Sequence, residues 1–230
     1  MTAMRLLPAI LCVLALPAAA FAATPTKDIK PYETFRFEYT STKPDTRTGF
    51  RYDVALDLPG DGSQPPVIQQ LRLSFAKGTG VDLGAVPACT AHNETITARG
   101  PVACPTQGRI ASGRAGVWTG PGPLLALSMS VFASGKRSIV VTLDSDGNVL
   151  SVLRGTLRRT TLTVAVPAIT VGAGTAALAR VHLTINGGSS KRPTFTTPST
   201  CARGGWPVTY APLFATLGRV TLVDVTKCRS

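Results

Sequence analysis

Residues 138–157 read SIVVTLDSDGNVLSVLRGTL, two runs of alternating apolar side chains around a short polar segment. Alternation with a period of two is typical of a β-strand that buries one face. Asp and Gly in the segment 144–148 tolerate the left-handed backbone conformations that tight hairpins need. This stretch predicts an antiparallel hairpin with strands at 138–143 and 149–157.

The same alternation recurs along most of the chain, whereas helical three-four spacing is almost absent. Phe50, Tyr52 and Val54, for example, alternate with Arg51 and Asp53. Gly- and Pro-rich joints separate the alternating runs, at 59–66, 119–123, 172–174 and 186–193. About ten or eleven strands are expected, at 35–39, 50–58, 71–75, 109–118, 125–131, 138–143, 149–157, 160–166, 178–185, 206–210 and 219–225.

Many short strands with turn punctuation favour an all-β fold, and we expect an antiparallel β-sandwich because a second sheet can cover the apolar face of the first. The pattern does not choose between a jelly-roll and an immunoglobulin-like topology. Residues 23–230 are long enough for a single sandwich domain. Two β subdomains divided near 119–123 are the alternative.

Residues 1–22 have the composition of a secretory signal peptide. Arg5 supplies the positive start, 6–16 form the apolar centre, and Ala20-Phe21-Ala22 provides small residues for cleavage before Ala23. The apolar run stops near Ala23, short of a comfortable membrane span of roughly 20 residues. We expect a secreted protein, with retention in the cell envelope as an alternative and no membrane span in the mature chain.

Four cysteines follow the leader, and an even number in an exported chain predicts two disulfides. We expect the pairs that are close in sequence, Cys89 with Cys104 and Cys201 with Cys228, although four cysteines permit three pairings. A four-thiolate metal site is disfavoured because neither pair has the short spacing of such sites.

The formal net charge is +12, so the protein is expected to be drawn to anionic surfaces. Acidic lipids, cell-surface polymers and extracellular polyanions are the classes that such a charge attracts, but an ordinary solvated surface, whose charge keeps the protein in solution, is the explanation we prefer. The basic residues are scattered and are not interleaved with aromatic residues, so we do not expect binding to nucleic acid.

Aromatic residues near the C-terminus form the candidate ligand site. Trp206 follows a Gly-rich segment after Cys201 and, with Tyr210, can form a platform for stacking on sugars. Core packing is nevertheless the role we expect for the two tryptophans, Trp118 and Trp206, since large aromatic residues dominate the cores of β-sandwiches.

Other chemistry-bearing residues have simpler explanations. His92 lies in the first cysteine loop without a defined partner, and His182 alternates with apolar residues and should face solvent. Asp144, Asp146 and Asn148 resemble part of a calcium loop but suffice as a hairpin turn. The sequence assigns no catalytic residue, no metal ligand and no cofactor.

Several short motifs resemble an uncharacterised family of secreted, disulfide-bonded β-rich proteins from high-GC Gram-positive bacteria. They are LRLSFAKGT at 71–79, VPAC at 86–89, CP at 104–105, IASGRA at 110–115, TPSTC at 197–201 and GW at 205–206. The resemblance extends over most of 40–210. It departs at Ala76, where the family has Pro, and at Ala202-Arg203, which separate the cysteine from the glycines. It implies a secreted, disulfide-bonded β protein and no particular activity.

We expect a secreted, non-enzymatic β-sandwich that binds a partner or associates with a surface, such as an anionic cell-surface polymer or glycan. A carbohydrate-binding module with exposed aromatic side chains is one alternative. An extracellular hydrolase whose site the sequence does not signal is the other.

Overall fold

The computed structural model describes residues 33–188 and 192–229. The signal peptide expected at 1–22 lies outside the described residues. The strands on either side of the Gly- and Pro-rich segment 119–123 pair directly with each other. No helix in the described ranges has the length and apolar character needed to cross a membrane.

Strands dominate the described chain. They are β1 (Glu33–Tyr39), β2 (Phe50–Leu56), β3 (Ile68–Ser74), β4 (Gly80–Val81), β5 (Arg109–Trp118), β6 (Leu125–Gly135), β7 (Ser138–Ser145), β8 (Asn148–Arg158), β9 (Thr161–Ala165), β10 (Ile169–Val171), β11 (Gly174–Ile185), β12 (Phe195–Thr196), β13 (Trp206–Tyr210), β14 (Leu213–Phe214), β15 (Gly218–Arg219) and β16 (Leu222–Thr226). The helices are α1 (Asn93–Arg99) and three 3₁₀ turns, η1 (Leu83–Ala85), η2 (Pro101–Ala103) and η3 (Thr106–Gly108).

The hairpin predicted from residues 138–157 is confirmed as β7 and β8. Ser145 pairs with Asn148 across a two-residue turn. Asp146 and Gly147 occupy that turn with φ angles of 51° and 85°. Two successive left-handed residues match the right-handed twist of the flanking strands, which is why Asp-Gly is favoured there.

The all-β, antiparallel prediction is confirmed, but the two-sheet sandwich is not. Most strands form one 14-stranded sheet whose main path is β1-β2-β11-β5-β6-β7-β8-β9-β3-β13-β16. Strands β4 and β12 form a separate two-stranded sheet. The strand number also exceeds the expected ten or eleven, because short strands such as β14 and β15 carry no alternation that sequence analysis can recognise.

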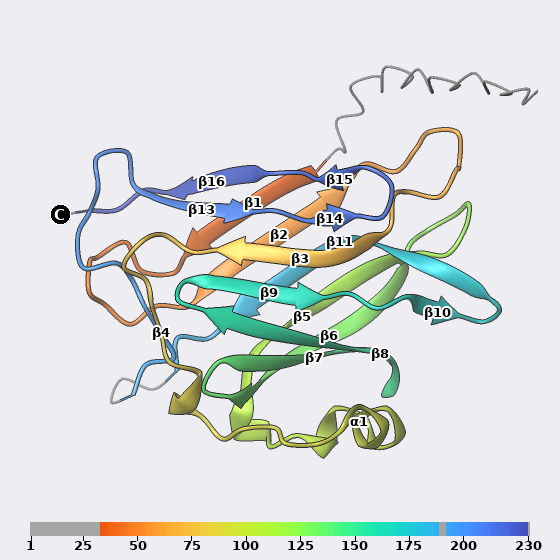
Figure 1. The fold of residues 1–230 in the computed structure, drawn as a ribbon, viewed down its shortest axis with the longest axis horizontal. Helices are drawn as coiled ribbons and strands as arrows, with labels where there is room; N and C mark the ends of the chain where they lie inside the picture. The colour runs from red at the N-terminus through yellow and green to blue at the C-terminus, as the bar shows by residue number, and fades with distance from the viewer. Residues whose placement is uncertain (1–32, 189–191, 230) are drawn as a thin grey trace, which may run out of the picture. The chain divides into compact units, whose positions relative to one another are not determined.

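The main sheet curls until its two edge strands meet, which gives a nearly closed, barrel-like sheet (Figure 1). At this meeting of β1 and β16, here called the seam, side chains replace a backbone ladder. The N–H of Phe37 donates to Asp224 Oδ2 at 2.7 Å, and the N–H of Tyr39 donates to Thr226 Oγ1 at 3.3 Å. Thr226 Oγ1 in turn donates to the Phe37 carbonyl at 3.2 Å. The N–H and carbonyl of Phe37 and the N–H of Tyr39 thus have partners without another strand.

Closure gives the sheet an inner and an outer face. The main core consists of inward-facing side chains from all around the sheet. A second, smaller core lies outside it, where α1 and its loop cover β6, β7 and β8 with Ile96, Phe132 and Val140 at its centre. Arg154 of β8 holds this loop through hydrogen bonds to Asn93 Oδ1 and the Ala91 carbonyl.

Candidate binding cavity

The interior of the barrel-like sheet contains an apolar cavity of about 110 Å³. Side chains alone fill the interior of a barrel of about eight strands, and larger barrels leave space. The main path here has more strands than that, so the inward side chains do not fully meet. The lining consists of Phe50, Tyr52, Leu71, Leu73, Phe75, Val81, Leu83, Ile110, Ala111, Met129, Val131, Ile139, Val141, Leu153, Leu157, Leu162, Val164, Leu178, Val181, Leu183, Ile185, Phe195 and Tyr210.

The small β4–β12 sheet covers one end of this cavity. Phe195 of β12 pairs with Val81 of β4, and both side chains line the cavity. The ring of Phe195 contacts Phe50 at a centroid distance of 5.2 Å and Phe75 at 6.1 Å. The backbone N–H of Thr48, just before β2, donates to the Phe195 carbonyl and so attaches this cover to the main sheet.

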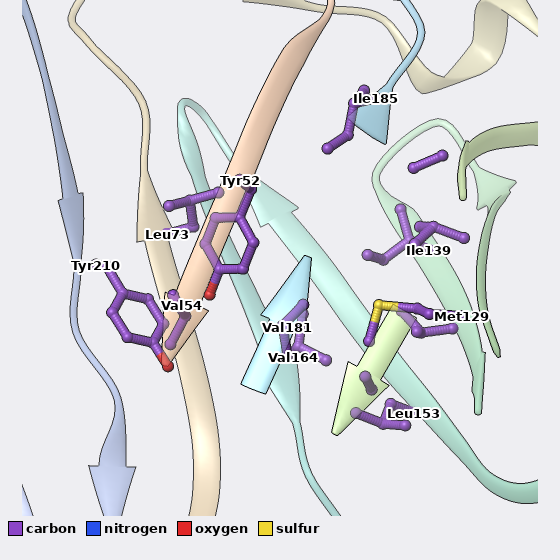
Figure 2. Close-up of a cluster of buried hydrophobic side chains, with 14 of the residues drawn as sticks. Tyr52, Val54, Leu73, Met129, Ile139, Leu153, Val164, Val181, Ile185 and Tyr210 are labelled. Carbon is purple, nitrogen blue, oxygen red and sulfur yellow. The ribbon is translucent and has the colours of Figure 1, made fainter. Parts of the chain in front are cut away.

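Among the described lining residues, two tyrosines have side chains that contain an oxygen atom (Figure 2). Tyr52 of β2 and Tyr210 of β13 lie with ring centroids 5.9 Å apart, and Tyr210 also stacks on Phe35 at 5.4 Å. Among the described lining residues there is no carboxylate, imidazole, thiol or aliphatic hydroxyl. The phenol hydroxyls of Tyr52 and Tyr210 are the titratable side-chain groups of this described lining, and retention of an apolar molecule needs only shape and apolar surface.

The structure places the two predicted ligand-binding aromatic residues in the interior. Trp206 is 2% exposed and Tyr210 is 1% exposed. The indole Nε1–H of Trp206 donates to the Thr200 carbonyl at 2.8 Å, and its ring meets Tyr39 edge-on. Neither ring face is open to solvent, so an exposed sugar platform is not retained. Tyr210 does line the apolar cavity.

Both predicted disulfides are confirmed, Cys89 with Cys104 and Cys201 with Cys228. The first belongs to the small outer core beside α1. The second links the loop before β13 to the residues after β16, and so ties down the end of the chain next to the seam. Two disulfides suggest an extracellular environment because the cytosol keeps thiols reduced.

The two histidines lie on the surface. His92 is exposed at the start of α1, and His182 projects from the outer face of β11. His182 Nδ1 contacts Asp53 Oδ1 of β2, and the two side chains remain 55% and 44% exposed. The two residues are directly opposite each other in the sheet register.

The calcium-like fragment is the β7–β8 turn. Burial raises the pKa of Asp144, Asp146 adds a like charge, and a hydrogen bond from the Gly147 N–H opposes both effects. The described residues hold no cluster of three or more His, Cys, Asp or Glu side chains arranged for a metal ion.

The cavity was not predictable from the sequence, although alternation indicates most of the strands that line it. Alternation identifies Tyr52, Leu73 and Leu183 as members of buried faces, but it does not distinguish a face that meets a second sheet from one that meets its own sheet across a cavity. The available signal was the number of strands, since a single closed sheet of this size leaves interior space.

Comparison with known proteins gives no relative whose ligand would suggest the ligand of this chain. No protein-family model matches the chain, and neither the curated proteins nor the solved structures contain a significant match.

Proposed function

We propose that this protein is an exported, non-enzymatic binding protein that holds a slender apolar molecule, such as an alkyl chain or a single aromatic ring, inside its sheet. The observation that carries the proposal is the apolar cavity of about 110 Å³. An engineered cavity of about 150 Å³ with a similar lining stays dry and binds benzene or xenon. The two disulfides and the resemblance noted in the sequence support export.

Binding would be driven by new dispersion contacts between the ligand and the lining side chains. Atoms facing an empty cavity have no dispersion partners on one side, and a fitting apolar ligand supplies them. Water finds few hydrogen-bond partners in such an apolar cavity. An entering ligand therefore does not have to displace tightly bound water. The flexible thioether of Met129 and the rings of Phe75 and Phe195 lie in the lining and can adapt to the ligand's outline.

Filling the cavity tests this proposal. Ala111 of β5 lines the cavity and is 1% exposed, so Ala111→Leu places a larger apolar side chain inside it. We expect benzene at about 1 mM to raise the unfolding temperature of the wild type and to shift methyl NMR signals of lining residues. In Ala111→Leu the affinity for benzene should fall by at least about tenfold.

Ala126→Leu is the matched control, because Ala126 lies exposed on the outer face of β6 and should leave benzene binding unchanged. If Ala111→Leu does not fold, Val141→Ile adds a single methyl group to the lining and should weaken binding by a smaller factor. Absence of benzene binding to the wild type, or equal binding by the folded Ala111 and Ala126 variants, would exclude the cavity as the site.

A further inference from the structure

The outer face of β1, β2, β11 and β5 carries a group of exposed cations. Outward positions on these strands hold Arg36, Arg51, Arg180 and Arg114, one on each strand, and all four are exposed. Exposed Lys227 follows β16 directly, on the other side of the seam. We call these five residues the basic face. Unlike the outer face of β6–β8, it is not covered by α1.

Two carboxylates near the basic face, those of Asp53 and Asp224, already have partners. Asp53 contacts His182, and Asp224 accepts hydrogen bonds from the backbone N–H groups of Phe37 and Val225 at 2.7 and 2.8 Å. Within the described part of the chain, none of the five cations forms an ion pair or a side-chain hydrogen bond. Glu38 lies opposite Arg51 in register without an ion pair. The cations are therefore available for an anionic ligand.

A groove of about 570 Å³ runs along the seam beside the basic face. Its charged lining consists of Arg36, Arg51 and Lys227 together with Glu38, Asp53 and Asp224. The mixed, charged lining does not suit a lipid tail or an apolar peptide face. It suits a hydrated, polar chain whose anionic groups can each meet a guanidinium or ammonium group.

The register sets the spacing of the cations. Arg36 and Arg114 lie in one row across four neighbouring strands, with Asp53 and His182 between them. Neighbouring strands are about 4.8 Å apart, so the ends of this row are separated by roughly 14 Å. The basic face is accordingly long enough to meet several charges of a linear polymer that lies across the strands.

Hydroxyl side chains lie among the cations. Thr184 pairs with Arg51 on one side and with Ser112 on the other, and Ser128 pairs with Arg114. All three hydroxyl residues are exposed and can hydrogen-bond to sugar hydroxyl groups. These rows hold no Phe, Tyr or Trp, so the stacking contacts that single-stranded nucleic acids use are missing from them.

From this arrangement we propose that the basic face and the seam groove bind a linear acidic polysaccharide. The proposal is independent of the interior cavity, since the two sites lie on opposite faces of the sheet. Together they describe a binding protein that is retained on a polyanionic surface.

The test compares two variants with the same loss of charge. Arg51→Gln/Arg114→Gln removes two cations of the basic face, and Arg99→Gln/Arg158→Gln removes two exposed cations on α1 and β8. Binding of the full chain to polygalacturonate, dextran sulfate and neutral dextran is measured at about 50 and about 200 mM NaCl. We expect binding to both acidic polymers and a loss of about tenfold or more in the first variant only, with a shallower salt dependence.

Three results would overturn the proposal. The first is an absence of binding to both acidic polymers at the lower salt concentration. The second is an equal loss in both variants, which would indicate attraction by net charge alone. The third is tighter binding to duplex DNA than to either polysaccharide with the same dependence on Arg51 and Arg114, which would make nucleic acid the ligand.

Discussion

Two pairs of neighbouring strands in this sheet are held together in different ways. Strands β6 and β7 are joined by a tight connection and paired through a backbone ladder along most of their length. Strands β1 and β16 come from opposite ends of the described chain and meet through the side chains of Asp224 and Thr226. The first pairing depends little on which side chains are present, whereas the second depends on two particular residues.

This difference shows where the sheet can be opened. A backbone ladder presents the same N–H and C=O groups whatever the side chains, so it fails chiefly when the strands cannot approach each other. The seam fails when one acceptor is removed, because a buried N–H then loses its partner. Beside the seam, the Cys201–Cys228 disulfide and a bond from the Arg229 N–H to the Thr42 carbonyl hold the chain end in place.

The largest effect is expected from a change that keeps two ladder strands apart. Gly113 of β5 lies so close to β11 that an added Cβ would overlap the backbone carbonyl of His182. Gly113→Ala should therefore cost about 3 kcal/mol or more of unfolding free energy, measured by urea denaturation. Gly174→Ala is the control, because a Cβ there meets only ordinary contacts. A cost below about 1 kcal/mol for Gly113→Ala would mean that the ladder tolerates displacement.

A smaller effect is expected at the seam. Asp224→Ala removes the acceptor of the Phe37 N–H and should cost about 1–3 kcal/mol. Hydrogen exchange should locate the change, with faster exchange at Phe37 and little change in the β6–β7 ladder. Asp224→Asn keeps one oxygen, which can accept from the Phe37 N–H at the expense of the bond from the Val225 N–H, and should therefore cost less than Asp224→Ala. Uniform acceleration of exchange across the sheet would show that the seam does not open separately.

The same difference explains what the sequence could predict. The β7–β8 hairpin depends on Asp146 and Gly147, which act on their immediate neighbours, so it was predictable from a short window. Closure of the sheet depends on Phe37 and Asp224, which are 187 residues apart. Alternation assigns each residue to a face but says nothing about which strands become neighbours or how far the sheet curls.

The candidate sites follow the same division. Pairing of the cysteines close in sequence was predictable, because each closed loop is short. Burial of Trp206 was expected from the size of its ring, although the Gly-rich segment before it left an exposed platform as an alternative, and its strand turns the ring inward to meet Tyr39. The cavity and the basic face were not predictable, because each requires the order of strands in the sheet.

The smallest effect at neutral pH is expected at Tyr39, next to the seam. Its hydroxyl and Thr79 Oγ1 are 2.8 Å apart in a hydrogen bond, so Tyr39→Phe should cost only about 1 kcal/mol at neutral pH. Burial raises the pKa of Tyr39 to about 12, against its ordinary value of 10.0, although hydrogen bonds to Thr79 and Ala76 oppose this rise. The folded protein therefore holds the phenolic proton at pH values where the unfolded chain releases it.

Because the native state binds more protons in this range, the stabilisation by neutral Tyr39 is complete below about pH 10 and is lost as the pH rises toward about 12. The full loss corresponds to about 3 kcal/mol for a shift of this size. Denaturation of the wild type between about pH 8 and about pH 11 should show falling stability, and Tyr39→Phe should flatten that slope. Thr79→Val is the control, because it removes the hydrogen bond but keeps the buried phenol and should retain the slope. If the unfolding free energy falls with pH equally steeply in the wild type and in Tyr39→Phe, the alkaline sensitivity comes from other groups. Protonation of Tyr39 would then not stabilise the region beside the seam.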